Sequence, residues 1–302
     1  MKRPSSHLVA VLQALFVTFL WSTSWVLIKI GLKDIPALTF AGLRYSLAFL
    51  CLLPFLLRPA SRAAVRGLSG RVWARLIALG LLFYAVTQGA QFLGLFYLRP
   101  ATVNLLLSFT PALVALLGVA WLAERPTALQ WAGAGLSLTG VVVYFYPVSL
   151  AAGEAIGLAV VTVCVLANAI SSILGRHINR SGDIQPLVVT GVSMGVGAGV
   201  LLAAGVGVQG LPRLSPLDWA IVGWLAVVNT ALAFTLWNHT LRTLSAVESS
   251  VINNTMLIQI AILAWLFLGD QLTGQEIVGL VLAVVGTLIV QSARPRKVKE
   301  AS

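Results

Sequence analysis

Ten runs of about 20 mostly apolar residues follow one another along the chain, and they restrict the fold more than any other feature. A helix needs about 20 apolar residues to cross the hydrocarbon core of a bilayer. Charged residues, proline or glycine separate most runs, and such short connections favour antiparallel neighbouring helices. The longest connection, residues 58–72, is expected to be a loop. The sequence therefore predicts an all-α integral membrane protein with spans at about residues 8–32, 36–57, 73–97, 101–122, 127–147, 153–175, 185–208, 216–238, 246–268 and 273–291.

Composition excludes the soluble classes of protein. Of 302 residues, 59% are hydrophobic and 10% are charged, whereas about a quarter of a typical soluble domain is charged. The net charge of +11 comes from basic residues between the runs and at the termini. Because they form no basic stripe, we expect no nucleic-acid partner. Cys51 and Cys164 lie inside apolar runs, so a disulfide framework is not expected.

The distribution of charge predicts the orientation of the chain. With a cytoplasmic N-terminus, most of the 20 Lys and Arg residues fall on the cytoplasmic side, as the positive-inside rule requires. Residues 1–7 and 292–302 are then both cytoplasmic tails, which demands an even number of spans. The first run stays apolar to about Leu32, which is too long for a cleaved signal peptide. We therefore predict a retained first helix.

The sequence also contains an internal repeat. Two segments align at one constant offset: Glu124 with Asp270, Thr127 with Thr273, Gln130 with Glu276, Gly133 with Gly279 and Gly140 with Gly286. We predict two five-helix repeats, residues 8–147 and 153–291. Five is an odd number of spans, so the second repeat must be inverted, and inverted repeats are typical of transporters with a midplane substrate site. The alternative is that two helix ends share similar chemistry by convergence.

Around this repeat, residues 101–143 and 247–289 resemble the paired EamA domains of the drug/metabolite transporter superfamily. The strongest match is residues 263–273, Leu-Ala-Trp-Leu-Phe-Leu-Gly-Asp-Gln-Leu-Thr, and the aromatic-led first span and Arg44 also match. The resemblance implies ten helices, a central cavity lined by spans 1, 3, 4, 6, 8 and 9, and a place in the bacterial inner membrane. Within the superfamily, the chain looks most like bacterial amino-acid exporters of the YddG type. It departs from the family at Asp270, where Glu is usual, and at Asn168, where Trp is frequent, which puts that part of the cavity in doubt.

Polar and aromatic side chains inside the spans are the candidate substrate-binding residues. Polar groups in hydrocarbon are costly unless they find a partner or line water, and the third span carries three of them on one helix face. The predicted set is Trp21, Tyr84, Gln88, Gln91, Asn104, Ser108, Asn168, Asn229, Trp237, Asn253 and Asn254. The alternative for each polar residue is a hydrogen bond that joins two helices, and for the tryptophans a place facing lipid.

Ionisable residues are scarce inside the spans. Glu248, about one turn into its span, comes nearest among the acids, and we interpret it as a capping or interfacial residue. We therefore expect no proton relay, no metal site and no cofactor. Arg44 lies about eight residues into the second span by the helical rise, where it must pair or reach the interface. The family resemblance favours a structural role, and an anion-binding role remains open.

Glycines are predicted to bring helices close together, because small residues let backbones approach. They lie on spans 5, 7 and 10, at Gly133, Gly140, Gly191, Gly195, Gly199, Gly279 and Gly286. The alternative for spans 5 and 10 is a contact in a homodimer.

These features predict a transporter that exports amino acids, with aromatic and large neutral ones favoured, and related metabolites by uncoupled alternating access. The alternative is a proton-coupled exporter of cationic drugs, which the missing buried acid disfavours. An enzyme would need a nucleophile with a base, or a metal cluster, and the sequence offers neither. The expected partners are a small-molecule substrate and the lipid bilayer, with the chain a monomer or a homodimer.

Overall fold

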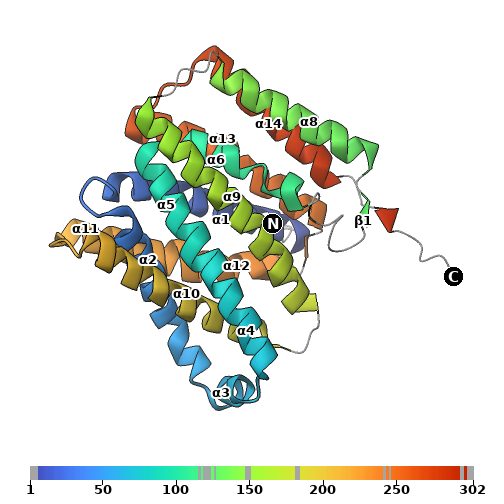
Figure 1. The fold of residues 1–302 in the computed structure, drawn as a ribbon. Coiled ribbons are helices and arrows are strands. Elements are labelled where there is room, and N and C mark those ends of the chain that lie inside the picture. Colours follow the sequence, from blue (N-terminus) through green and yellow to red (C-terminus); the bar gives the residue numbers. More distant parts are fainter. Residues whose placement is uncertain are drawn as a thin grey trace, which may run out of the picture. The chain divides into compact units, whose positions relative to one another are not determined.

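The structure is a computed structural model of the chain, and helices dominate it (Figure 1). It describes residues 6–114, 117, 124–125, 127–146, 151–180, 184–240, 243–244, 246–292 and 296–297. Apart from helices, this part of the chain contains two short strands, β1 (Glu124–Arg125) and β2 (Arg296–Lys297), which pair antiparallel. The predicted all-α class is therefore confirmed.

The helices follow the apolar runs. In chain order they are α1 (Ser6–Gly31), α2 (Ala37–Leu56), α3 (Pro59–Arg66), α4 (Gly70–Leu79), η1 (Gly80–Thr87), α5 (Gln88–Tyr97), α6 (Pro100–Leu107), α8 (Ala128–Phe145), α9 (Ala152–Arg180), α10 (Pro186–Gln209), α11 (Pro216–Ala226), η2 (Val227–Leu232), α12 (Ala233–Thr240), α13 (Ala246–Leu268) and α14 (Gly274–Ser292). In the described residues, six helical segments are long and apolar enough to cross a membrane, and four apolar helices are shorter. The chain is thus a multi-pass membrane protein, while ten spans remain a prediction.

Three local features differ from the expected helices. The connection at residues 58–72 is not all loop, because Pro59 occupies the first turn of helix α3 and favours its start. The fourth span is interrupted by a turn at Ser108 and Phe109. Pro111 explains this turn, since it lacks the N–H that would bond to the carbonyl of Leu107. The third and eighth spans each contain a π-helical segment, η1 and η2.

Contacts divide the chain into two compact units. Unit 1 comprises Met1–Val26, Leu98–Ala155 and Leu232–Ser302, and unit 2 comprises Leu27–Tyr97 and Ile156–Ala231. Each unit takes helices from both predicted repeats. The units of packing therefore differ from the sequence repeats, whose boundaries remain a prediction.

In unit 1, helices α8 and α14 lie side by side (Figure 1). A Cβ atom on Gly140 would lie 2.6 Å from the carbonyl oxygen of Gly279, and one on Gly133 would lie 2.7 Å from that of Gly286. These distances leave no room for a side chain, so the predicted packing role of these glycines is confirmed. Because these glycines form the contact between α8 and α14, they are not free to form the alternative contact in a homodimer.

In unit 2, helix α10 packs closely against α2 through two other glycines. A Cβ atom on Gly42 would lie 2.5 Å from the Cα of Leu202, and one on Gly205 would lie 2.5 Å from the backbone nitrogen of Thr39. Of the three glycines predicted on α10, Gly191 and Gly195 contact large side chains, whereas a Cβ atom at Gly199 would have no atom within 4 Å. Packing is thus confirmed for two of these three residues.

Candidate substrate site

Part of the predicted polar stripe of span 3 lies in the interior of unit 2. Tyr84 and Gln88 are both buried, and Tyr45 on α2 connects them. The Tyr45 hydroxyl donates a 2.6 Å hydrogen bond to Oε1 of Gln88, and its ring centroid lies 5.7 Å from that of Tyr84. Gln91, the third member of the stripe, is half-buried. The structure therefore joins two of the three predicted residues through one that the sequence analysis missed.

Arg44 on α2 lies beside this tyrosine pair and is only 5% exposed. Its Nε and Nη2 atoms each lie 3.4 Å from Oγ1 of Thr230 on η2, beyond the usual range of about 2.7–3.2 Å. The guanidinium carbon lies 5.2 Å from the ring centroid of Tyr45 and 6.0 Å from that of Phe92. We call Arg44, Tyr45, Tyr84, Gln88, Phe92 and Thr230 the Arg44 cluster.

The two π-helical segments, η1 and η2, share one hydrogen-bond pattern. The Thr87 hydroxyl donates to the carbonyl of Leu82, and the Thr230 hydroxyl donates to that of Leu225, both at 2.8 Å and five residues back. A π-helix bonds at this spacing along its backbone and often marks a functional site. Cys164 of α9 donates to the Thr87 carbonyl at 3.2 Å, so a side chain from another helix reaches each π-segment.

The other predicted residues of unit 2 are two asparagines. Asn229 is fully buried next to Thr230 in η2. Asn168 of α9 is half-buried, and its backbone carbonyl accepts hydrogen bonds from Ser171 and Ser172. Both asparagines remain candidates.

In unit 1, the structure brings two predicted tryptophans together. The ring centroids of Trp21 and Trp237 lie 5.2 Å apart, and Phe234 lies at the same distance from Trp21. Asn254 is buried, whereas Asn253 is exposed. The pair of indole rings supports a shared role for the two tryptophans.

The remaining predicted residues of unit 1 lie on the fourth span. The Asn104 amide nitrogen is buried and has no hydrogen-bond partner among the described residues. The Ser108 hydroxyl donates to the carbonyl of Leu105 in its own helix at 2.6 Å. The Asn104 amide nitrogen is thus available to a ligand, whereas the Ser108 hydroxyl bonds to the backbone of its own helix.

The sequence analysis also missed a polar contact between α1 and α13. The Ser22 hydroxyl donates to Oε1 of Gln259 at 2.8 Å, and the Gln259 amide nitrogen lies 3.0 Å from the Thr255 hydroxyl. Gln259 stands alone in an aliphatic stretch of its span, and this isolation was the available signal. Its role fits hydrogen bonding between helices.

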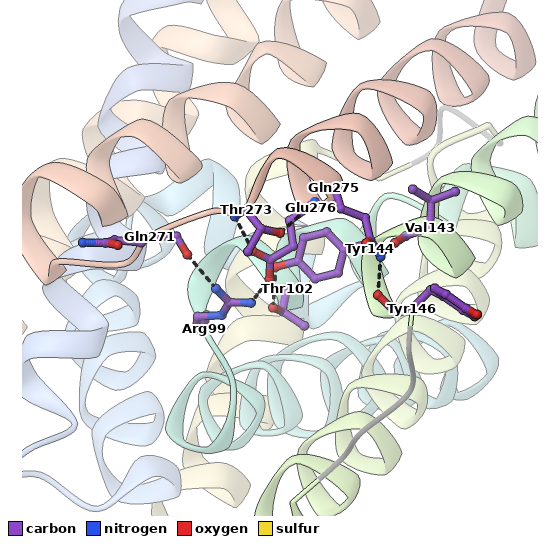
Figure 2. Close-up of polar contacts among 9 residues, drawn as sticks. All are labelled: Arg99, Thr102, Val143, Tyr144, Tyr146, Gln271, Thr273, Gln275 and Glu276. Carbon is purple, nitrogen blue, oxygen red and sulfur yellow. Dashed lines mark hydrogen bonds and ion pairs between the residues drawn. The ribbon is translucent and has the colours of Figure 1, made fainter.

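A second arginine forms a contrasting cluster at the ends of helices in unit 1 (Figure 2). Arg99 forms an ion pair with Glu276 in the first turn of α14 and donates to the carbonyl of Gln271 at 3.1 Å. Burial alone would lower the pKa of Arg99, but the hydrogen bond and charge of Glu276 outweigh it and raise that pKa. We call Arg99, Gln271 and Glu276 the Arg99 clamp.

Neighbouring contacts extend this region of unit 1. The Thr102 and Tyr144 hydroxyls lie 2.9 Å apart, and the Gln275 amide donates to the Val143 carbonyl at 2.8 Å (Figure 2). These contacts join the start of α6, the end of α8 and the start of α14.

Acidic side chains of the described residues lie at helix ends. Asp34 follows α1, Asp218 bonds to Ser215 at the start of α11, and Asp270 lies between α13 and α14. Glu154 and Glu276 lie in first turns. The side chain of Glu248 lies outside the described part of the chain. Among the described residues, no group of three or more His, Cys, Asp or Glu side chains is placed to hold a metal ion.

A groove of about 600 Å³ lies between α13 and α14 in unit 1. Its lining is aliphatic apart from Trp265 and Gln271, and it includes none of the predicted site residues. Such a lining offers few hydrogen bonds to a polar solute. The groove is therefore not the candidate substrate site.

These observations define a class of protein. The long apolar helices make the chain a multi-pass membrane protein, and the polar and aromatic clusters lie among those helices. The sequence profile of the EamA-like transporter family matches residues 8–146 and 155–292. The chain belongs to the EamA-like transporter family, with two EamA repeats, and is a transporter rather than an enzyme.

Similar proteins support this assignment. "Uncharacterized transporter YvbV" of Bacillus subtilis is 25% identical over 290 residues, covering 92% of this chain and 90% of its own. "Uncharacterized inner membrane transporter YedA" of Escherichia coli K12 is 26% identical over 255 residues, covering 79% of this chain and 76% of its own. A solved crystal structure with 20% identity superimposes with a TM-score of 0.65 over 95% of this chain and 98% of that one, which shows the shared fold alone. The names of these relatives state no substrate.

Proposed function

We propose that the protein exports amino acids and related small metabolites across the bacterial inner membrane by alternating access, without ion coupling. Aromatic and large neutral amino acids are the favoured substrates, as in exporters of the YddG type. The two EamA repeats support alternating access, because inverted repeats move against each other around a midplane site. The "inner membrane" in the name of YedA supports the location.

The polar and aromatic side chains inside the two units support the proposed class of substrate. Unit 2 buries Tyr45, Tyr84 and Gln88 in one hydrogen-bonded and aromatic group, and unit 1 pairs Trp21 with Trp237. Aromatic faces suit a large side chain, and amides and hydroxyls suit the polar groups of an amino acid. We assign the eleven residues predicted from the sequence to the substrate pathway on this basis.

The placement of acids favours uncoupled transport over the alternative, a proton-coupled exporter of cationic drugs. Proton relays and sites for cations inside membranes use buried carboxylates. In the described part of the chain, the acidic side chains lie at helix ends. A solute exported down its own gradient needs no such group.

Release from proteoliposomes tests the proposal. Vesicles containing the purified protein are loaded with labelled phenylalanine and diluted into buffer of the same pH and ion content. We expect release well above that of protein-free vesicles, and a Trp237→Ala variant should slow it because the indole pair is lost. Arg213→Gln, which changes an exposed arginine before α11, is the matched control and should release at the wild-type rate. Release that requires a pH gradient would contradict uncoupled transport and favour the alternative.

A further inference from the structure

Arg44 is a buried cation that contacts no acidic side chain among the described residues of its own unit. Unit 2 contains three acidic residues by sequence, Asp34, Asp183 and Asp218. Asp34 is exposed in the turn before α2, and Asp218 accepts hydrogen bonds from Ser215. Asp183 lies outside the described residues. Among the described residues of unit 2, the polar contact of the Arg44 guanidinium is therefore with Thr230 alone.

That contact leaves most of the binding capacity of the guanidinium unused. A guanidinium carries five N–H donors in a planar fork, and two of its nitrogens share the single oxygen of Thr230 at 3.4 Å. That hydroxyl is also committed, because it donates to the Leu225 carbonyl at 2.8 Å. The rings of Tyr45 and Phe92 offer their faces to the cation, which attract it without neutralising its charge.

The missing partner of such a group is an anion with two oxygens. A carboxylate matches the guanidinium fork with two parallel hydrogen bonds, and an ionisable residue within a membrane span is expected to mark a substrate pathway. Tyr84 and Gln88 continue the cluster beyond Tyr45, so aromatic and amide groups lie next to the cation.

We propose that Arg44 binds the carboxylate of the transported solute, with Tyr45 and Phe92 holding the guanidinium in place. This inference rests on the proposed function and narrows it, since the substrates are then organic acids and amino acids that keep a free α-carboxylate. Amides and esters of the same molecules bind weakly, because the guanidinium gains no negative partner from them.

Competition between three related molecules tests the proposal. Phenylalanine, 3-phenylpropanoate and phenylalaninamide share one ring and differ in their carboxylate and amine. Each competes against labelled phenylalanine in counterflow with proteoliposomes. We expect the two carboxylates to compete at least about tenfold more strongly than the amide, the ratio for losing one charge-assisted bond.

Substitution of Arg44 is expected to remove this selectivity. Arg44→Gln should bring the ratio to about one, and Arg44→Lys should keep part of it, because an ammonium retains the charge but not the planar fork. Arg213→Gln, at an exposed arginine of the same unit, should retain the wild-type ratio. An Arg44→Gln protein that still prefers carboxylates as the wild type does would overturn the proposal.

A measurement on the unchanged protein covers the case in which Arg44→Gln does not fold. Phenylglyoxal modifies accessible arginines, and mass spectrometry follows the peptide that contains Arg44. We expect 3-phenylpropanoate to slow its modification severalfold and phenylalaninamide to leave it unchanged. Equal rates with both, or an Arg44 that never reacts, would contradict the proposal.

The two proposals fail in different ways. If the wild-type protein moves no amino acid in counterflow, the proposed export function is wrong. Protection of Arg44 by 3-phenylpropanoate, together with a rise in melting temperature that Arg44→Gln abolishes, would still establish a carboxylate site.

Discussion

Arg44 and Arg99 each carry a guanidinium cation that requires hydrogen-bond acceptors, and the two side chains have very different partners. Arg99 lies between two helices in unit 1, has 40% of its side chain exposed, and forms an ion pair with Glu276. Arg44 lies within α2 in unit 2, is 5% exposed, and contacts a hydroxyl and two aromatic rings. The two arginines therefore differ both in exposure and in the presence of a carboxylate partner.

The difference indicates how each arginine is used. An arginine at a helix end with its own carboxylate fixes the geometry of the chain. An arginine inside a span that contacts no carboxylate among the described residues keeps a cost of desolvation that a ligand can offset. Proteins that hold strained or destabilising groups usually do so where function requires them.

Disruption of the α8–α14 helix pair, on which the Arg99 clamp is built, should destabilise unit 1 strongly. Gly140→Val places a branched side chain where a Cβ already lies 2.6 Å from backbone atoms of α14. We expect a loss of about 3 kcal/mol or more in stability, at the upper end for overpacking. Gly135→Val, on the same helix, is the matched control, because a Cβ atom at Gly135 would have no contact within 4 Å.

Maleimide labelling reports which unit opens, with Cys51 replaced by alanine. A Ser137→Cys reporter lies in the α8–α14 contact of unit 1, and the buried Cys164 lies in unit 2. In Gly140→Val we expect the reporter at position 137 to react quickly while Cys164 stays protected. Equal exposure of both thiols would contradict the separation into two units.

Removal of the charge of Arg44 and removal of that of Arg99 should change stability in opposite directions. Arg44→Met removes an unpaired buried charge and keeps much of its volume, so the empty protein should gain about 1–3 kcal/mol of stability. Arg99→Met leaves Glu276 without its cation and should lose about 1 kcal/mol, a value reduced by the exposure of the side chain. Thermal unfolding in detergent without ligand measures both changes, with Arg213→Met as control. Destabilisation by Arg44→Met comparable to that by Arg99→Met would mean that Arg44 is structural.

The apolar runs predicted the helices because a bilayer requires length and hydrophobicity, and both are local properties. The segment after α2 was missed because the formation of α3 depends on Pro59 at its first turn and on only eight residues. The π-segments were missed for a different reason. An apolar run with a threonine looks the same whether its hydroxyl bonds four or five residues back, and Thr87 and Thr230 bond five back.

The candidate site was predictable in its residue types but not in its partners. Tyr84 and Gln88 follow from polarity within one helix, whereas Phe92 and Thr230 reach Arg44 from helices distant in sequence. The glycine pattern likewise predicted close packing, yet only the structure identifies α14 as the partner of α8. The sequence pattern indicates which polar side chains and glycines need a partner, and tertiary packing determines which residues become those partners.

The coupling energy between Arg99 and Glu276 in the Arg99 clamp should be small. A double-mutant cycle uses Arg99→Gln, Glu276→Gln and the pair, and glutamine at position 276 keeps an acceptor for the Thr273 backbone N–H at the start of α14. We expect a coupling of about 1 kcal/mol at low salt, because the arginine is partly exposed. Raising the salt to 1 M should remove most of this coupling by screening, whereas the effect of Arg44→Met on stability should persist, since a buried charge is screened much less. A coupling that survives high salt would mean that the Arg99 pair is as secluded as Arg44, and the distinction between the two arginines would then rest on the carboxylate alone.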